Sequence, residues 1–159
     1  MMHSHVGPEP IDISAVIDMV RRPGNGGITT FLGTVRDEAD GSALVGLEYT
    51  AYIEMAQKEL RKIVGQAAAI GTGVDIAAVH RIGSLAVGDV SVVIAAGHAH
   101  RDSAFEACRY VIEEIKRRVP IWKRERYATG DSEWVVPADA AVAVAAAAAR
   151  PVAVPPTGA

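Results

Sequence analysis

The chain has 159 residues, of which 50% are hydrophobic and 22% charged, enough for one domain with a substantial core. Its net charge of -3 argues against a general nucleic-acid surface, because binding a phosphate backbone needs clustered, unopposed basic residues. A single cysteine excludes an intrachain disulfide framework and a metal site built from several thiolates. The N-terminus lacks the apolar core of a signal peptide, and Gly97 and His98 interrupt the best apolar run, so a cytoplasmic protein is expected.

Residues 1–11 are expected to form a flexible lead into the domain. A short helix should follow, because Asp12 or Ser14 can cap it and apolar residues recur after them at helical spacing. The stretches ITTFLGTVR (28–36) and LVGLEYTAY (44–52) are rich in β-branched and aromatic residues. They predict two strands, and we expect these strands to pair across the polar loop between them.

From Ile53 to Ile70 apolar residues recur at steps of three and four, which is typical of an amphipathic helix. VDIAAVHRIG and DVSVVIAAG predict two further strands, with SLAVGD as the turn between them. A third helix is expected from a capping box of Ser103 and Glu106 as far as Pro120, whose ring ends it. Its predicted core-facing stripe consists of Phe105, Cys108, Ile112, Ile115 and Val119.

The segments WKRERY and SEWVV, joined by ATGD, predict a closing β-hairpin. Residues 137–159 are an Ala/Val/Pro-rich, low-complexity tail with little to specify a fold, so the domain proper is expected over residues 12–136. The order of its helices and strands predicts an α+β fold, with a mostly antiparallel sheet and packed helices.

Two lysines flank the proline of VPIWKRE (119–125). Lys116 lies close to three helical turns after Phe105, so we expect it beside the apolar stripe with a partly desolvated ammonium group. Desolvation lowers a lysine pKa toward values useful for proton transfer or nucleophilic attack. A bend at Pro120 would bring Lys123 toward Lys116, and two ammonium groups held close together would bind an anion. A structural alternative stays open for each lysine. Lys116 could be a helix-end lysine that extends to solvent, and Lys123 could belong to an edge strand whose charges prevent aggregation.

His98, His100 and Arg101 lie where a predicted strand meets the third helix. Free N–H groups at a helix start, with an arginine beside them, suit a phosphate or a carboxylate. The two histidines would share one side of an extended segment, but no third ligand follows at zinc-like spacing, so no metal site is expected. Arg36 is a candidate for the same pocket, or else a solvent-facing arginine, and Cys108 is expected to be core packing.

Together these stretches resemble the family of molybdopterin synthase catalytic (large) subunits. The matching segments lie within residues 28–135 and are FLGTVRD, LEYTAY, HRIGSLAVGD, HAHRDSAFEA, IKRRVPIWKRE and GDSEW. The chain departs from the family at Thr50, where an acidic residue usually follows LEY. The resemblance implies an α/β-hammerhead-like fold and a sulfurtransferase. Such enzymes convert cyclic pyranopterin monophosphate to molybdopterin by inserting the two sulfurs of a dithiolene.

The same resemblance implies the partners. Sulfur would arrive as a thiocarboxylate on the C-terminal Gly-Gly of a small ubiquitin-like subunit, bound at each end of a homodimer of this chain in a heterotetramer. Carried over by motif, Lys116 and Lys123 are the catalytic residues and also bind substrate, together with Arg36, His100 and Arg101. No cofactor or metal is implied. Whether His100 and Arg101 serve the lysines of their own chain or those of the neighbouring subunit stays open.

Two other functions compete with this one. The chain could be a non-catalytic docking module that holds the C-terminal carboxylate of a ubiquitin-like protein in a cationic cleft. It could instead bind RNA, but that function needs exposed stacking aromatics, and only 5% of the residues are aromatic.

Overall fold

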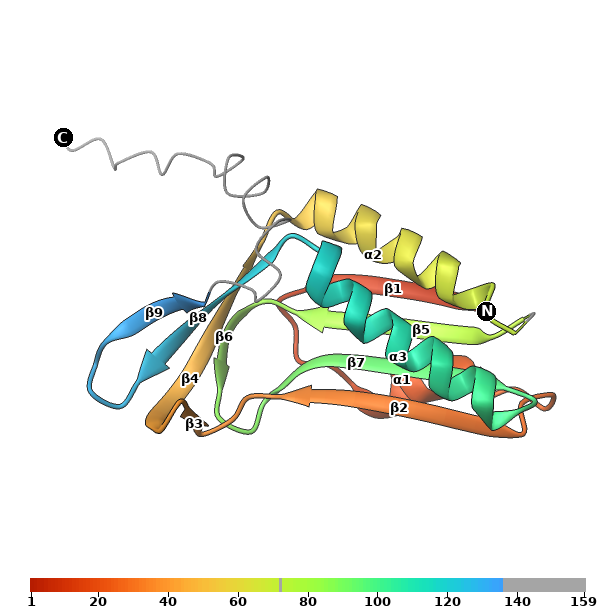
Figure 1. The fold of residues 1–159 in the computed structure, drawn as a ribbon, viewed down its shortest axis with the longest axis horizontal. Coiled ribbons are helices and arrows are strands. Elements are labelled where there is room, and N and C mark those ends of the chain that lie inside the picture. The colour runs from red at the N-terminus through yellow and green to blue at the C-terminus, as the bar shows by residue number, and fades with distance from the viewer. Residues whose placement is uncertain (72, 136–159) are drawn as a thin grey trace.

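The structure is a computed structural model and describes residues 1–71 and 73–135. Its strands form two sheets (Figure 1). A four-stranded sheet carries the helices and is called the larger sheet, because its strands contain more residues; the smaller sheet has five strands and is set at one end of it. The larger sheet has the order β1 (Met2–Gly7), β5 (Asp75–Arg81), β7 (Val90–His98), β2 (Gly27–Thr34). The smaller sheet has the order β3 (Glu38–Ala39), β4 (Ser42–Ala51), β8 (Ile121–Tyr127), β9 (Ser132–Val135), with β6 (Gly83–Ala86) also paired to β4.

Three helices among the described residues cover the larger sheet. One face is covered by α1 (Ile13–Val20), whose start is capped by the Asp12 carboxylate, which accepts a hydrogen bond from the Ala15 N–H at 3.0 Å. The other face is covered by α2 (Ile53–Ala68) and α3 (Arg101–Arg118), which pack against each other (Figure 1). The central strand β7 is buried along most of its length because helices lie on both of its faces.

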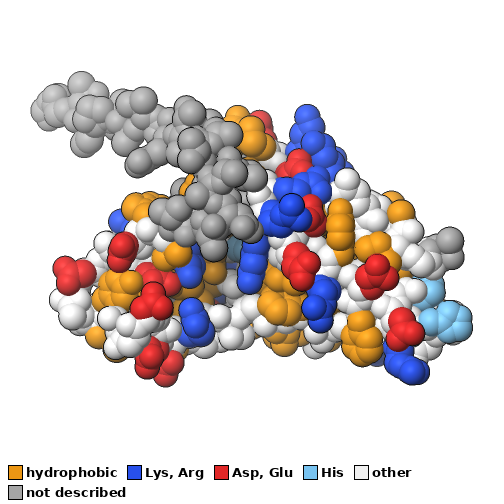
Figure 2. Space-filling view, viewed as in Figure 1, with side chains coloured by type: hydrophobic (Ala, Val, Ile, Leu, Met, Phe, Trp, Pro, Cys, Tyr) orange, Lys and Arg blue, Asp and Glu red, His pale blue; other side chains and the backbone are white. Residues whose placement is uncertain are grey.

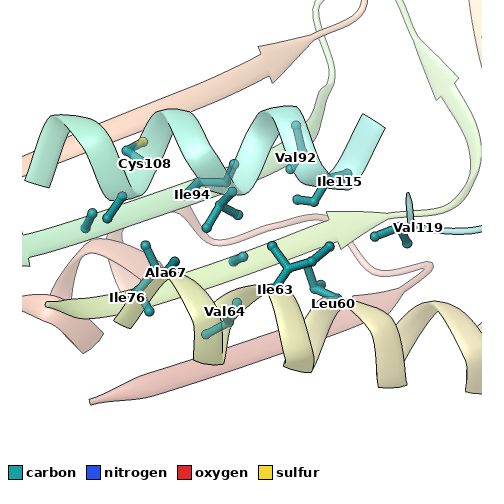
Figure 3. Packing of buried hydrophobic residues seen from close by; sticks show 14 of the residues in the cluster. Leu60, Ile63, Val64, Ala67, Ile76, Val92, Ile94, Cys108, Ile115 and Val119 are labelled. Atoms are coloured by element: carbon teal, nitrogen blue, oxygen red, sulfur yellow. The ribbon is translucent and has the colours of Figure 1, made fainter. Parts of the chain in front are cut away.

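The main core lies between the larger sheet and the pair α2 and α3 (Figure 3). Each helix presents one apolar stripe to the sheet, and burial of each large aliphatic side chain contributes about 1.5–3 kcal/mol. The largest contributors include Leu60, Ile63 and Val64 of α2, Val111 and Ile115 of α3, and Ile76, Val92 and Ile94 of the sheet.

The N-terminal residues are a strand and not a flexible lead, so that prediction is wrong for residues 2–7. β1 pairs in parallel with β5, and α2 covers its outer edge through one side chain. Gln57 accepts a hydrogen bond from the Val6 N–H and donates one to the Ser4 carbonyl, each at 3.0 Å. The sequence MHSHVG has little apolar alternation, and the strand exists because β5 and Gln57 supply its hydrogen-bond partners.

The predicted pairing of the strands at 28–36 and 44–52 is also wrong. β2 pairs antiparallel with β7, whereas β4 pairs with β6 and β8 in the other sheet. β4 instead forms a tight hairpin with β3, closed by Asp40 and Gly41 at φ values of 49° and 80°. Positive φ at both central residues matches the twist of a two-residue hairpin. The expected turn SLAVGD is partly strand, since β6 adds to the edge of β4.

The third helix begins at Arg101, with His100 as its N-cap and no side-chain hydrogen bond there, so the predicted capping box is wrong. Phe105 is 57% exposed and lies outside the core, contrary to prediction. The helix contacts the sheet through the neighbouring small residues Ala104 and Ala107, which leaves Phe105 on the outer side. The end of the helix before Pro120 and the burial of the Cys108 side chain are confirmed.

The closing hairpin is confirmed, with β8 and β9 paired antiparallel around a turn at Gly130. The α+β fold with mostly antiparallel pairing is also confirmed, and β1 with β5 is the parallel exception among the described strands. The low-complexity tail predicted at 137–159 lies outside the described residues. No helix of the described part of the chain is long and apolar enough to span a membrane.

Candidate active site

A tight corner joins α3 to β8. The Val119 N–H still donates to the Ile115 carbonyl at 3.1 Å, as in the helix, while the Ile121 N–H donates to the Val119 carbonyl at 2.8 Å. The second bond closes a three-residue turn around Pro120, whose ring favours the required φ. Val119 and Pro120 are both buried, so the change of direction between Lys116 and Lys123 is fixed by packing.

Lys123 lies on an interior strand, because β8 is flanked by β4 and β9, so the edge-strand interpretation is wrong. Its Nζ donates to Glu125 Oε1 at 2.9 Å, and the hydroxyl of Tyr127 donates to Glu125 Oε2 at 3.0 Å. The Glu125 side chain is only 8% exposed. Burial alone would raise the pKa of Glu125, but the hydrogen bonds from Lys123 and Tyr127 outweigh it and hold that pKa below its usual value.

Arg36 lies close to the same carboxylate. It is exposed and follows the end of β2, and its positive charge also lowers the pKa of Glu125. Glu125 carries one negative charge against the positive charges of Arg36 and Lys123, and the carboxylates of Asp40 and Glu133 act on the neighbouring Tyr127. Two of the predicted site residues, Arg36 and Lys123, therefore act on the same carboxylate, and cations of this kind suit an anion.

Lys116 is exposed on the last turn of α3, so the partly desolvated ammonium group expected for it is not found in the single chain. Its neighbour Ile115 faces the core, and each residue of a helix is rotated by about 100° from the last, which turns Lys116 outward. Figure 2 shows several Lys and Arg side chains on this side of the molecule, with Asp and Glu side chains among them.

The other predicted residues lie at the opposite end of α3. An open pocket of about 310 Å³ is lined by His100 and Arg101 together with Gly26, Ala99 and Asp102. Arg101 is exposed, and its Nε is 3.9 Å from a carboxylate oxygen of Asp102. The pocket lies at the start of α3, the place for which the sequence predicts an anion site, because free N–H groups at a helix start favour anions.

The two histidines at this end are linked through the His98 ring and the His100 backbone. Nδ1 of His98 accepts a hydrogen bond from the His100 N–H at 3.1 Å, so that nitrogen is used by the backbone. Nowhere in residues 1–71 and 73–135 do three His, Cys, Asp or Glu side chains gather in a way that could hold a metal ion.

The helix α3 separates the two groups of cations. Fifteen steps of about 1.5 Å from Arg101 to Lys116 place their Cα atoms roughly 22 Å apart. Within one chain, the two residues at the start of α3 therefore lie too far from the three cations at its other end to bind one small ligand together with them.

The structure adds residues near Lys123 that the sequence analysis missed. Glu125 could have been found, because residues 123, 125 and 127 of a strand share one face. Tyr49, opposite Lys123 on β4, packs edge-on against His80 with ring centroids 5.2 Å apart. Burial lowers the pKa of His80 to about 4, so its ring is neutral, and Nδ1–H can donate to the Arg81 carbonyl at 2.9 Å. No sequence motif marks His80 as buried.

The fold and its two cationic groups define an α+β protein suited to acidic ligands. The chain belongs to the MoaE family, since the family model described as "MoaE protein" matches residues 6–118. A protein of Thermoplasma volcanium named "Molybdopterin synthase catalytic subunit" is 46% identical over 125 residues, which cover 79% of this chain and 89% of that one. The resemblance stated from the sequence is thereby confirmed.

Solved structures agree with this assignment. The crystal structure of molybdopterin synthase from Staphylococcus aureus matches with a TM-score of 0.78 and 37% identity, over 82% of this chain and 94% of that one. A complex of subunits 1 and 2 of the molybdopterin-converting factor from Helicobacter pylori matches with a TM-score of 0.69 over 83% and 89% of the two chains. At 21% identity, the second match shows a shared fold.

Proposed function

We propose that this chain is the catalytic subunit of a molybdopterin synthase that acts in the cytoplasm. The reaction is a sulfur transfer that converts cyclic pyranopterin monophosphate to molybdopterin by inserting the two sulfurs of a dithiolene. The sulfur comes from the C-terminal thiocarboxylate of a small ubiquitin-like subunit. The observation that carries the proposal is the rigid corner at Pro120, with one lysine on each side of it, in a chain of the MoaE family.

The proposed roles follow the positions of the cations. Lys116, exposed beside the corner, meets the incoming thiocarboxylate, where its ammonium group stabilises the tetrahedral oxyanion or moves a proton. Lys123 and Arg101 hold the substrate phosphate, and Arg36 adds a further anion contact. His100 protonates a leaving oxygen.

We propose that two copies of the chain complete the site, because the cations at the two ends of α3 lie too far apart to act together in one chain. The outer edge of β1 is closed by Gln57, but β2 is the opposite edge of the same sheet. It carries exposed Ile28 and Leu32, at 38% and 43%, and has no charged residue or proline. Such an edge is suited to pairing with another strand.

Antiparallel pairing of two β2 strands about a two-fold axis would place two α3 helices antiparallel. Phe31 packs against the core cluster that contains Cys108, and Gly27 lies against the backbone of Arg101, so the middle of α3 lies over the middle of β2. A two-fold axis through the middle of β2 would place Arg101 at the same height along the paired helices as Lys116 of the partner subunit. It would also set exposed Phe105 level with Ile112 of the partner subunit, which accounts for an apolar side chain outside the core.

The proposed function is tested by mixing the purified chain with the thiocarboxylated small subunit and cyclic pyranopterin monophosphate. The expected result is a dithiolene-containing product, detected after oxidation as a fluorescent pterin. Binding of the small subunit with no product, under conditions where a known synthase is active, would leave only the docking-module function.

A further inference from the structure

The last residue of α3 connects the two helices that cover the main core. Nε of Arg118 donates to Glu59 Oε1 at 2.9 Å, and Nη1 donates to Gln66 Oε1 at 2.8 Å; both acceptors belong to α2. Nη1 also donates to Glu114 Oε2 on α3 at 2.9 Å. One guanidinium group therefore ties the end of α3 to two positions on the neighbouring helix.

Both sides of this contact are charged. The hydrogen bond with Glu114, followed by the bonds and charge of Glu59, raises the pKa of Arg118. Burial alone would raise the pKa of Glu59, but hydrogen bonds from Lys62 and Arg118 lower it below its usual value. The Arg118 side chain is 28% exposed and that of Glu59 18%, so the pair is partly shielded from solvent. Charge-assisted bonds of this kind have well-defined geometry.

The contact decides the rotation of the last helical turn. Lys116 precedes Arg118 by two residues, which corresponds to a rotation of about 200° around the helix axis. When Arg118 faces α2, Lys116 must therefore face away from α2. The contact adds to the packing of the buried residues Ile115, Val119 and Pro120, because the final residues of a helix lack intrahelical partners for most of their carbonyl groups.

The same contact lies directly before the corner. Val119 and Pro120 follow Arg118, and β8 with Lys123 begins immediately after them. Any change in the rotation of the last turn would be transmitted to the start of β8, since the three-residue turn around Pro120 has little freedom. Arg118 thus lies between the two lysines in sequence and connects their corner to α2.

We propose that Arg118 is a positioning residue for sulfur transfer, which fixes the last turn of α3 so that Lys116 and Lys123 serve one bound substrate. The proposal rests on the proposed function of the chain. Arg118 itself faces α2 and does not touch the reacting groups; its effect is exerted through the geometry of the two lysines.

A neighbouring arginine provides a matched control. Arg117 also donates to Glu114, with its Nη1 at 2.9 Å from Oε1, but its side chain is 61% exposed and its ion pair stays within α3. Replacing Arg117 removes the same charge and the same kind of bond to the same carboxylate, yet leaves the tie to α2 intact.

The test uses the complete complex with the thiocarboxylated small subunit and compares Arg118→Gln with Arg117→Gln. We expect kcat to fall at least about 10-fold in Arg118→Gln, with KM for the pterin changed less than about 2-fold, because catalytic geometry is lost and binding is not. The Arg117→Gln variant should keep kcat within about 2-fold of the original. Equal kcat values in the two variants would overturn the proposal.

A second variant changes the residue of α2 that accepts a hydrogen bond from Arg118. Glu59→Gln should lower kcat in the same direction but by less than Arg118→Gln, because the bond from Arg118 to Gln66 remains, and the double variant should be no worse than Arg118→Gln alone. Hydrogen exchange should show faster exchange at the amides of residues 115–119 in both variants and not in Arg117→Gln. A kcat loss in Arg118→Gln with unchanged exchange at those amides would also contradict the proposal.

These readouts separate the positioning role from the proposed function. If the unaltered complex makes no dithiolene product, the proposed function fails, whatever Arg118 does. If the unaltered complex is active and Arg118→Gln matches Arg117→Gln in kcat, the positioning role alone fails. A global loss of folding would appear as faster exchange throughout the larger sheet and not at residues 115–119 alone.

Discussion

Lys123 and Glu125 form an ion pair on one face of β8, with 2.9 Å between Nζ and Oε1. The carboxylate is the more buried partner, with 8% of its side chain exposed against 29% for the lysine. Tyr127 holds the other carboxylate oxygen, so Glu125 keeps one orientation and fixes the ammonium group in turn. The lysine with the proposed phosphate contact is therefore held in place before any ligand arrives.

The first prediction follows from this pair. Glu125→Gln should reduce kcat/KM at least about 10-fold and destabilise the fold by about 1–3 kcal/mol, because Lys123 loses a charged acceptor in a partly buried setting. Denaturant unfolding and steady-state kinetics measure the two effects. Glu133→Gln is the control, since Glu133 lies opposite Glu125 on β9 but is exposed. Equal effects in the two variants would contradict the role given to the ion pair.

A second prediction concerns the exposed lysine beside the corner. Lys116→Ala should lower turnover at least about 100-fold while binding of the small subunit and self-association stay unchanged, because the side chain is exposed and packs in no core. Turnover under saturating substrate and sedimentation of the complex measure the outcome. Near-normal turnover in this variant would refute the catalytic role of Lys116.

The third prediction tests whether the site is shared between subunits. Lys116→Ala and Arg101→Ala should each be nearly inactive alone, but unfolding and refolding them together should restore about a quarter of the original activity. Random mixing gives about half mixed dimers, and each mixed dimer has one intact site if Arg101 of one subunit serves Lys116 of the other. No recovery in mixtures that contain mixed dimers would show that each site is built within one chain.

The fourth prediction concerns the open edge of the larger sheet. Leu32→Lys should convert the assembly to single copies of this chain, because a charge on β2 opposes pairing with a second β2. Light scattering after gel filtration measures the mass. Val87→Lys is the control, since Val87 is a similarly exposed apolar residue, at 41%, in the connection between β6 and β7. A dimer retained in Leu32→Lys would exclude β2 as the contact.

The fifth prediction is a pH dependence caused by His80. Its pKa is about 4 in the fold, below the ordinary value of 6.5, so between these values the unfolded chain binds a proton that the folded chain does not. The free energy of unfolding should therefore fall by roughly 2 kcal/mol between pH 7 and pH 5, and it should be insensitive to this group above pH 7. Urea unfolding at each pH measures this change.

His80→Phe supplies the comparison for that experiment. The phenyl ring fills similar space beside Tyr49 but cannot take a proton. At pH 7 the free energy of unfolding of this variant should be about 1 kcal/mol lower than that of the original chain, because the hydrogen bond to the Arg81 carbonyl is lost. Between pH 7 and pH 5 its free energy of unfolding should fall less than that of the original chain. Parallel curves for the two proteins would mean that His80 does not cause the pH dependence.

The sequence by itself determined those features that depend on neighbours along the chain. The helix after Asp12, the helix predicted over 53–70 and the end of α3 before Pro120 depend on capping, helical spacing and the proline ring, which act within a few residues. The closing hairpin and the presence of a lysine on each side of Pro120 are local in the same sense. The motifs that carry the family resemblance are also short and contiguous.

Only the tertiary structure decided the features that depend on distant segments. β1 exists because β5 and Gln57 complete its hydrogen bonds, and β2 pairs with β7 although β4 is nearer in sequence. Phe105 fits the helical stripe but lies outside the core, because small residues beside it make the contact with the sheet. The distance along α3 between Arg101 and Lys116 likewise follows from one unbroken helix. A strand's partner and a side chain's burial are set by surfaces that meet only when the chain has folded.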